Sequence, residues 1–492
     1  MQKFYTPFSK LVLVCSLLLL TACGGGGGSS DSDSDNTTLD ENTNFFKEPA
    51  SIASWTTDGT GSEIYANTPL QPKPGDFNND GHMDFVVTYA GSANPDTVGF
   101  PNGPHVLGIP FRIYLNDTNG GFYDGTASII SGTVPGSLFI RTIQIADFNG
   151  DGLTDLFLGE APELSQDTTL WAYADLLFLS NASTEKLENK SNQLIWVQPD
   201  WPNISAVRAI NERYTHESDQ SDFDKDGDID LLLSTSSKSG TVIMVNDGNG
   251  VFTEHTQMGK NLSNLNAGSL KSAFADVNND GAVDYINPSS DQTSGDNAVF
   301  LNDTIGNFNA LPSIALPAPI LLEDSSEDIE ATDVNGDGFM DAILLNTKFL
   351  ADGGGQHFIQ VLINDGTGNF TDETSSRFDV VNDWPANTNP LFDVIDMNND
   401  GVKDIVIVIH NVLNHFEPHV DDWTQIWINV DGVFTLVETN LPILLNELGI
   451  ADFNNDGLMD IVSYKQGSTT TDNINFRHEL VLIEANKVLS TD

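Results

Sequence analysis

The sequence contains almost no cysteine. Its two cysteines, Cys15 and Cys23, both lie within the first 23 residues of a chain of 492 residues. The remainder of the chain therefore has no thiol that could form a disulfide, bind a metal or act as a nucleophile. Explanations of the main part of the chain that rest on disulfides, cysteine-ligated metals or cysteine catalysis are excluded.

Positive charge is also scarce. The chain carries 20 Lys and Arg against 71 Asp and Glu, so its formal charge is 20 − 71 = −51. A nucleic-acid-binding protein needs a basic surface to neutralise phosphates, so this balance argues against that class. Long helical patterns are few, whereas 42 Gly, 28 Phe and 39% hydrophobic residues favour a large core built from strands and turns.

Local signatures of common catalytic sites are missing. The sequence has no Gly-x-Ser-x-Gly elbow, no phosphate-cradling loop and no His-Glu-x-x-His motif, which disfavours the enzymes that depend on them. Polysaccharide cleavage by a carboxylate pair or by histidine leaves no such pattern. We therefore assign no catalytic residue and expect a protein that is not an enzyme, while a carbohydrate-active enzyme stays open as the alternative.

The N-terminus carries an export signal. Two lysines precede the apolar run Leu11 to Leu20, which is too short to remain as a membrane-spanning helix and is typical of a secretory signal peptide. The residues Leu-Thr-Ala-Cys that end at Cys23 resemble the lipoprotein signal of bacteria. The resemblance implies that residues 1–22 are removed and that Cys23 is lipidated. Ordinary cleavage near Ala22 is the alternative.

A flexible tether is expected after this cysteine. Residues 23–44 contain five consecutive glycines, Gly24 to Gly28, followed by alternating Ser and Asp, a composition that cannot bury a core. Gly24 directly after the cysteine resembles the pattern that sends lipoproteins to the outer membrane of Gram-negative bacteria. We expect an envelope protein held to the membrane by its N-terminal lipid, on either the periplasmic or the outer side.

A nine-residue pattern, Asp-x-Asn/Asp-x-Asp-Gly-x-x-Asp, occurs seven times. The copies begin at Asp76, Asp147, Asp222, Asp276, Asp333, Asp396 and Asp452. Calcium takes about six to eight oxygen ligands at roughly 2.3 to 2.6 Å, and the side chains at positions 1, 3, 5 and 9 with the carbonyl of position 7 supply most of such a set. Glycine at position 6 permits the positive φ of a sharp turn.

Each copy predicts its own calcium site, with ligands at positions 1, 3, 5, 7 and 9. In that order, they are Asp76, Asn78, Asp80, His82 and Asp84; Asp147, Asn149, Asp151, Leu153 and Asp155; Asp222, Asp224, Asp226, Asp228 and Asp230; Asp276, Asn278, Asp280, Ala282 and Asp284; Asp333, Asn335, Asp337, Phe339 and Asp341; Asp396, Asn398, Asp400, Val402 and Asp404; and Asp452, Asn454, Asp456, Leu458 and Asp460. We expect about seven structural Ca²⁺ sites, because an all-oxygen cage with few open positions suits bracing. Catalytic or calcium-sensing sites are the alternative.

The surroundings of these loops predict four strands per repeat. Apolar runs such as Phe85 to Val87 follow the last ligand, which indicates a buried strand and excludes the EF-hand, with its Glu at position 12 and flanking helices. A second motif, as in Asn246 to Phe252 and Asn364 to Phe370, predicts a hairpin turn, although the second and seventh repeats depart from it. Four strands, A to D, in seven repeats predict an all-β fold, a seven-bladed β-propeller of four-stranded antiparallel blades over residues 45–492.

The loops resemble those of the FG-GAP or VCBS repeat family, which is related to the propeller of integrin α-subunits. The resemblance covers about residues 45–492 and implies that the aspartate loops bind calcium, as the count of oxygen ligands indicates independently. The seventh repeat ends soon after Val488. We therefore expect the segment around Trp55 to supply its missing outer strand and close the ring.

The two faces of such a propeller are expected to differ. Adjacent strands are antiparallel, so the metal loops and the C-to-D turns share one face and the long B-to-C connections share the other. Loops on a rigid scaffold commonly carry function, although polar residues also collect in loops without one. The candidates for a ligand face opposite the metal loops are His105, Trp201, His357, Trp384, His410, His415, His419 and Trp423.

These features together predict a function. We expect a calcium-stabilised, lipid-anchored propeller that acts as a monomer and binds a glycan or a protein ligand in recognition or adhesion. No contact with nucleic acid is expected. A carbohydrate-active enzyme resembling polysaccharide lyases and a structural subunit of an outer-membrane assembly are the alternatives.

Overall fold

The structure is a computed structural model of the chain. It describes residues 45–56, 68–90, 109–137, 140–160, 175–196, 215–235, 241–255, 272–288, 298–303, 308, 311–318, 324–349, 355–379, 383–384, 388–411, 423–437, 439, 441–442, 444–466 and 477–489. All of them belong to one compact unit, Asn42–Asp492, so the predicted signal peptide, Cys23 and the tether lie outside the described residues. Within these ranges, no helix has the length and apolar character that a membrane crossing needs.

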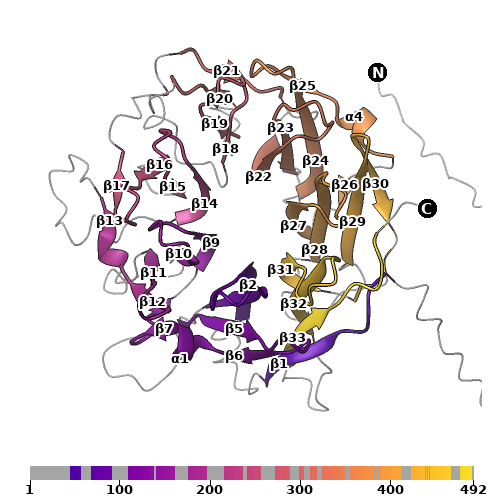
Figure 1. Ribbon diagram of the computed structural model, residues 1–492. Coiled ribbons are helices and arrows are strands. Elements are labelled where there is room, and N and C mark those ends of the chain that lie inside the picture. The colour runs from indigo at the N-terminus through magenta and orange to yellow at the C-terminus, as the bar shows by residue number, and fades with distance from the viewer. Residues whose placement is uncertain are drawn as a thin grey trace, which may run out of the picture. The chain divides into compact units, whose positions relative to one another are not determined.

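This unit is a propeller of seven sheets that stand around a common centre (Figure 1). Each sheet is built on four strands, A to D from the centre outward, and neighbouring strands of the four are antiparallel. We call the sheets blades 1 to 7 in chain order. The predicted fold class and the predicted order of strands, loop, connection and turn are confirmed.

Each blade consists of its four strands in the order A to D. From blade 1 to blade 7 they are β2 (Thr68–Gly75), β3 (Asp84–Ala90), β5 (Arg112–Asn116) and β6 (Phe122–Asp124); β9 (Ile140–Ala146), β10 (Asp155–Glu160), β11 (Leu176–Asn181) and β12 (Lys186–Asn189); β14 (Thr215–Ser221), β15 (Asp230–Thr235), β16 (Thr241–Val245) and β17 (Phe252–Glu254); β18 (Ala273–Ala275), β19 (Asp284–Asn287), β20 (Ala298–Phe300) and β21 (Ile314–Ala315); β22 (Asp324–Thr332), β23 (Asp341–Phe349), β24 (Gly355–Asn364) and β25 (Phe370–Asp372); β27 (Thr388–Ile395), β28 (Asp404–Asn411), β29 (Trp423–Val430) and β30 (Val433–Val437); and β31 (Leu445–Ala451), β32 (Asp460–Gln466), β33 (Arg477–Ile483) and β1 (Ala50–Thr56).

Short elements join the blades. β7 (Ile130–Ser131) and β13 (Leu194–Ile195) pair in parallel with the outer strands of blades 2 and 3, and β26 (Asp383–Trp384) pairs with β24. β4 (Ile109–Pro110) pairs with β8 (Gly136–Ser137). The described helices are single turns: α1 (Thr126–Ile129), α4 (Thr374–Arg377) and the 3₁₀ helix η1 (Ser191–Gln193).

The hydrophobic core lies between neighbouring blades. In β10, the run Leu156 to Leu158 has all three side chains buried. Leu156 and Leu158 pack in one cluster with Val86 of blade 1, whereas Phe157 packs in another cluster with Leu231 of blade 3. Successive side chains of a strand point to opposite faces, so the continuous apolar run is covered by a different neighbour on each face.

An N-terminal segment closes the ring. β1 pairs antiparallel with β33 as the outer strand of blade 7, with Trp55 opposite His478. Just before β1, Phe46 forms a bridge with Ala485. The Phe46 side chain is 1% exposed and belongs to a core cluster shared by blades 6 and 7. The prediction that the segment around Trp55 completes the last blade is confirmed.

We expect Phe46→Ala to lower the free energy of unfolding by about 3 to 5 kcal/mol, because it removes a buried aromatic ring and leaves a cavity. Chemical denaturation followed by tryptophan fluorescence measures the change. Val488→Ala, at a position that is 52% exposed, is the control and should change the value by less than about 0.5 kcal/mol. Equal stability of Phe46→Ala and the parent protein would contradict the closing role of this segment.

Candidate metal centre

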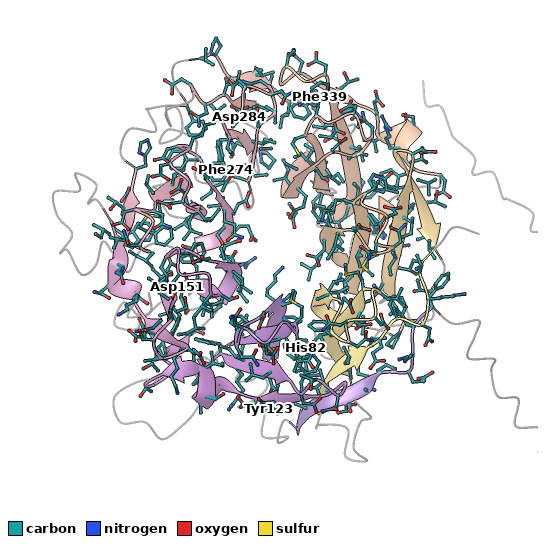
Figure 2. All side chains as sticks on the ribbon, viewed as in Figure 1. His82, Tyr123, Asp151, Phe274, Asp284 and Phe339 are labelled. Carbon is teal, nitrogen blue, oxygen red and sulfur yellow. The ribbon has the colours of Figure 1, made fainter. Side chains whose placement is uncertain are left out.

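The seven aspartate loops connect strand A to strand B in every blade. We call them loops 1 to 7: residues 76–84, 147–155, 222–230, 276–284, 333–341, 396–404 and 452–460. Position 9 of each loop is the first residue of strand B. Figure 2 labels His82, Asp151, Asp284 and Phe339 from loops 1, 2, 4 and 5, which lie in separate blades around the ring.

The backbone of each loop turns through two left-handed residues. Glycine at position 6 has φ between 80° and 98° in all seven loops, as predicted. Position 4 is also left-handed, with φ between 56° and 74°, a conformation that Gly and Asn tolerate best. Sequence reasoning missed position 4, although Asn or Gly occupies it in six of the seven loops. Lys225 in loop 3 is the exception.

In six of the seven loops, backbone N–H groups hold the side chains at positions 1 and 3 over the loop. In loop 1, Asp76 accepts hydrogen bonds from the N–H groups of Asp80 and Gly81 at 3.1 and 3.0 Å. The Asp80 N–H also donates to Asn78 Oδ1 at 3.0 Å. Loops 2, 4, 5, 6 and 7 repeat this network. Local turns thus bring positions 1, 3 and 5 together.

The position-9 aspartate is buried in every loop and joins three parts of its blade. In blade 4, Asp284 accepts a hydrogen bond from the N–H of Val277, at position 2 of the loop, at 3.1 Å. Its other oxygen accepts one from the N–H of Asn302, just after strand C, at 2.8 Å. The other six blades repeat both bonds, at 2.7 to 3.1 Å and at 2.6 to 2.8 Å. The aspartate loop and the C-to-D turn therefore share one face, as predicted.

Burial dominates the protonation of these aspartates. It raises the pKa of Asp84 to about 7, that of Asp230 to about 8 and that of Asp404 to about 6. The two backbone N–H donors lower each pKa, but by less than desolvation raises it. A cation bound in the loop would favour the ionised form, so metal binding and protonation oppose each other at this position.

An asparagine in the last residues of strand C, or just after it, clamps each of five blades to the preceding one. Asn302 donates its Nδ2 hydrogens to the carbonyl of Val283 in its own loop at 3.1 Å and to that of Phe223 in loop 3 at 2.9 Å. The corresponding bonds to the preceding blade come from Asn116, Asn246, Asn364 and Asn429, at 2.7 to 2.9 Å. Blades 2 and 7 have Ser180 and Ala485 at this place.

The donors present in the loops fit a hard divalent cation. All side chains at positions 1, 3 and 5 offer oxygen, the ligand that calcium prefers. In loop 3, oxygens of Asp222, Asp224 and Asp226 lie within 4.8 Å of one another. Asp222 Oδ1 and Asp224 Oδ1 are buried and have no hydrogen-bond partner. Buried carboxylate oxygens without a donor are stabilised by a cation.

The structure shows a further role for position 9. Asp230 is not part of the convergent group of loop 3, and both oxygens of every position-9 carboxylate already accept a backbone hydrogen bond. Position 9 therefore anchors the loop to strand C. Its predicted role as a metal ligand, and that of the position-7 carbonyls, stay predictions.

Two of the predicted ligand-face residues lie in the core. His357 is 5% exposed within β24, and its Nδ1 lies 2.7 Å from Thr347 Oγ1. Trp384 is 3% exposed and donates from Nε1 to Gln425 of blade 6 at 2.9 Å. Placing them on a binding surface was wrong. His357 lies inside strand β24, paired with β23, and not in a connection between strands. β26 inserts Trp384 between blades 5 and 6.

The structure does not describe the side chains of the remaining ligand-face candidates. His410 and Trp423 lie at the ends of β28 and β29, where the structure describes the backbone only. Those outside the described residues are His105, Trp201, His415 and His419. They stay predictions.

A known repeat family matches part of the chain. The FG-GAP-like repeat family matches residues 76–158 and 222–286, and each matched stretch runs from one aspartate loop through the next. A search among curated proteins found no match.

Among solved structures, the chain is similar to a protein of unknown function from Dyadobacter fermentans DSM 18053, with 10% identity, 89% of this chain and 99% of that chain covered, and a TM-score of 0.40. It is also similar to a GH43 β-1,3-galactosidase, with 9% identity, 91% and 97% covered, and a TM-score of 0.32. A third is a β-fructofuranosidase from Schwanniomyces occidentalis complexed with fructosyl-erythritol, with 9% identity, 92% and 100% covered, and a TM-score of 0.29.

We expect Asn302→Ala to lower the free energy of unfolding by about 2 to 4 kcal/mol, because it leaves one buried and one partly buried carbonyl without their donor. Chemical denaturation measures the change. Asn249→Ala, which removes an exposed turn bond of 3.1 Å to Asp247, is the matched control and should cost less than about 0.5 kcal/mol. A loss for Asn302→Ala no larger than that of the control would contradict the clamp.

We expect the protein in chelator to melt at a lower temperature at pH 8 than at pH 5. The folded pKa values of the position-9 aspartates are about 6 to about 8, above the ordinary value of 3.8. The stability from their protonated form is therefore fully present below about pH 4 and lost as the pH rises through 6 to 8. Calorimetry measures this slope, which millimolar calcium should reduce. A melting temperature in chelator that rises from pH 5 to pH 8 would refute the assignment.

Proposed function

Because the chain carries FG-GAP-like repeats in a seven-bladed propeller, we propose that it is a calcium-braced recognition module that binds a glycan or a protein ligand at the cell envelope. The observation that carries the proposal is the way each acidic loop is built into its blade, with a buried aspartate joining loop and strand C. A cation site within the frame of every blade suits bracing. The braced ring then offers its opposite face for recognition.

Calcium would be held by the side chains at positions 1, 3 and 5 of each loop, with position 9 and the position-7 carbonyl as further predicted ligands. Bound calcium supplies the positive charge that these converging carboxylates need. With dissociation constants of about 0.1 to 1 mM, calcium at about 1 mM contributes roughly 0.4 to 1.4 kcal/mol per site. Over the seven loops this sums to about 3 to 10 kcal/mol, which is comparable with the stability of a domain.

The proposed recognition surface includes one edge of blade 6. In β28, His410 lies opposite Asn389, and the preceding Ile409 lies opposite Trp423 at the start of β29. This edge is the strand end away from Asp404, where β28 leaves loop 6. The register therefore brings a histidine and a tryptophan to one edge of the blade on the side opposite the metal loop. Rings of this kind combine flat apolar area with a polar group, which suits a sugar or a polar protein surface.

The predicted lipid on Cys23 would hold the module to a membrane. The described chain begins at Phe45, directly after the tether, and Phe46 and β1 are then packed and paired in the last blade. A pull on the tether would act on the strand that closes the ring. Attachment through a paired strand and a buried aromatic residue suits a permanently anchored module.

The proposal is tested by retention on an array of glycans and matrix proteins, with millimolar calcium and again with chelator. We expect calcium-dependent retention on a defined ligand, and at least a tenfold weaker retention for Trp423→Ala and His410→Ala. Tyr123→Ala, at an aromatic residue 52% exposed on the outer strand of blade 1 (Figure 2), is the matched control and should bind like the parent protein. Absence of retention, with the fold intact in calcium, would count against recognition and favour an enzyme or an assembly subunit.

A further inference from the structure

Loop 3 differs from the other six loops in its acidic side chains. It carries aspartate at every second residue from Asp222 to Asp230, whereas the other loops have asparagine at position 3 and a residue other than an acid at position 7. Asp224 occupies position 3 and Asp228 occupies position 7. The loop therefore contains five carboxylates, against three in each of the others.

The carboxylates at positions 1, 3 and 5 of loop 3 converge on one point. One oxygen from each of Asp222, Asp224 and Asp226 lies within 4.8 Å of the other two. Oxygens that share one calcium ion at about 2.3 to 2.6 Å stand at most about 5 Å apart. Within the described residues, this is the one group of three or more acidic, histidine or cysteine side chains with such spacing. The geometry of a shared ion is thus already present in loop 3.

Two of these three aspartates have a carboxylate oxygen without a hydrogen-bond partner. Asp222 Oδ1 and Asp224 Oδ1 are buried without a hydrogen-bond partner, and no other loop aspartate among the described residues is in that state. In loop 5, by contrast, the amide of Asn335 donates to Asp337 Oδ2 at 2.9 Å. Loops 1 and 6 have the same bond at 2.9 and 2.8 Å. An aspartate at position 3 cannot make that bond, because an ionised carboxylate only accepts.

The lysine within loop 3 does not neutralise the carboxylates of that loop. Lys225, at position 4, is left-handed, and its Nζ lies toward loop 4, where a Cβ on Gly281 would stand 3.0 Å from it. The ion pairs found among the described residues include none between Lys225 and the carboxylates of its own loop. The negative charge of loop 3 is therefore left for an external cation.

We propose that loop 3 is the high-affinity calcium site of the propeller and fills at a concentration at least about tenfold below that of the other loops. The proposal rests on the calcium bracing proposed above and adds an order of filling to it. Higher ligand charge and a preformed cage both raise calcium affinity. In loops 1, 5 and 6 calcium must first displace the amide bond at position 3, whereas in loop 3 it meets oxygens that have no partner.

If loop 3 fills with calcium first, the blades that it contacts are affected first. The Phe223 carbonyl at position 2 of loop 3 accepts the clamp from Asn302 of blade 4, and Asn246 of blade 3 clamps onto Phe148 of loop 2. Both clamps involve residues that the buried Asp230 holds in place through its two backbone bonds. Calcium at low concentration would therefore brace blades 2, 3 and 4 before the remainder of the ring.

The test is calcium titration of the full-length protein in detergent by calorimetry, with a reciprocal pair of variants. The parent protein should show one site that is at least tenfold tighter than the rest. Asp224→Asn gives loop 3 the asparagine of the other loops and should abolish this tight class. Asn335→Asp gives loop 5 an aspartate at position 3 and should add a second tight site. Melting in chelator checks the fold, and Asp224→Asn should melt no lower than the parent because it removes a repelled carboxylate.

The outcomes separate this proposal from the bracing on which it rests. About seven equivalent sites in the parent protein, with a calcium-dependent melting temperature, would overturn the order of filling and leave bracing intact. A tight class that survives in Asp224→Asn would also overturn it. No binding of calcium up to about 10 mM would overturn both proposals, since even weak extracellular sites bind below that concentration.

Discussion

The propeller depends on one interaction that is repeated in every blade, the burial of an aspartate carboxylate at the start of strand B. In blade 4, Asp284 has both oxygens occupied by backbone N–H groups, one from its own loop and one from the end of strand C. A buried carboxylate without donors is costly, so the loop and strand C are held in one register with strand B. The acidic loop is therefore part of the frame of the blade and not an appendage to it.

The residues around this aspartate also link each of five blades to the preceding one. The buried aspartate accepts one of its two bonds from a residue at the end of strand C, and this residue is asparagine in five blades. The side-chain amide of the asparagine donates to the loop of the preceding blade, as Asn302 donates to the Phe223 carbonyl. The boundaries that lack this amide have other connections. Phe46 from the N-terminal segment packs between blades 6 and 7 beside Ala485, and the connection after blade 1 pairs with blade 2 through β7. The ring is thus closed by different means at different boundaries.

In the proposed function, bracing and recognition lie on opposite sides of the ring. The loops, turns and clamps share one face, as the bonds of Asp284 to the C-to-D turn show. The ends of β28 and β29 that carry His410 and Trp423 lie at the other edge of blade 6. A ligand at that edge would meet strands whose register is already held by buried hydrogen bonds, so little conformational entropy would be lost on binding. The proposed order of filling would add a graded response to calcium on the side of the aspartate loops.

Local features of this protein follow from sequence alone, because their partners lie within a few residues. The nine-residue pattern determines the loops, the left-handed glycine at position 6 and the convergence of positions 1, 3 and 5, and the apolar runs after each loop determine buried strands. Only the tertiary structure decided that Asp84 binds Asn116, 32 residues away, and that Asn116 reaches Phe453 across 337 residues. It also decided that His357 and Trp384 are buried, because burial depends on which strands become neighbours when the ring closes, and no local pattern encodes that.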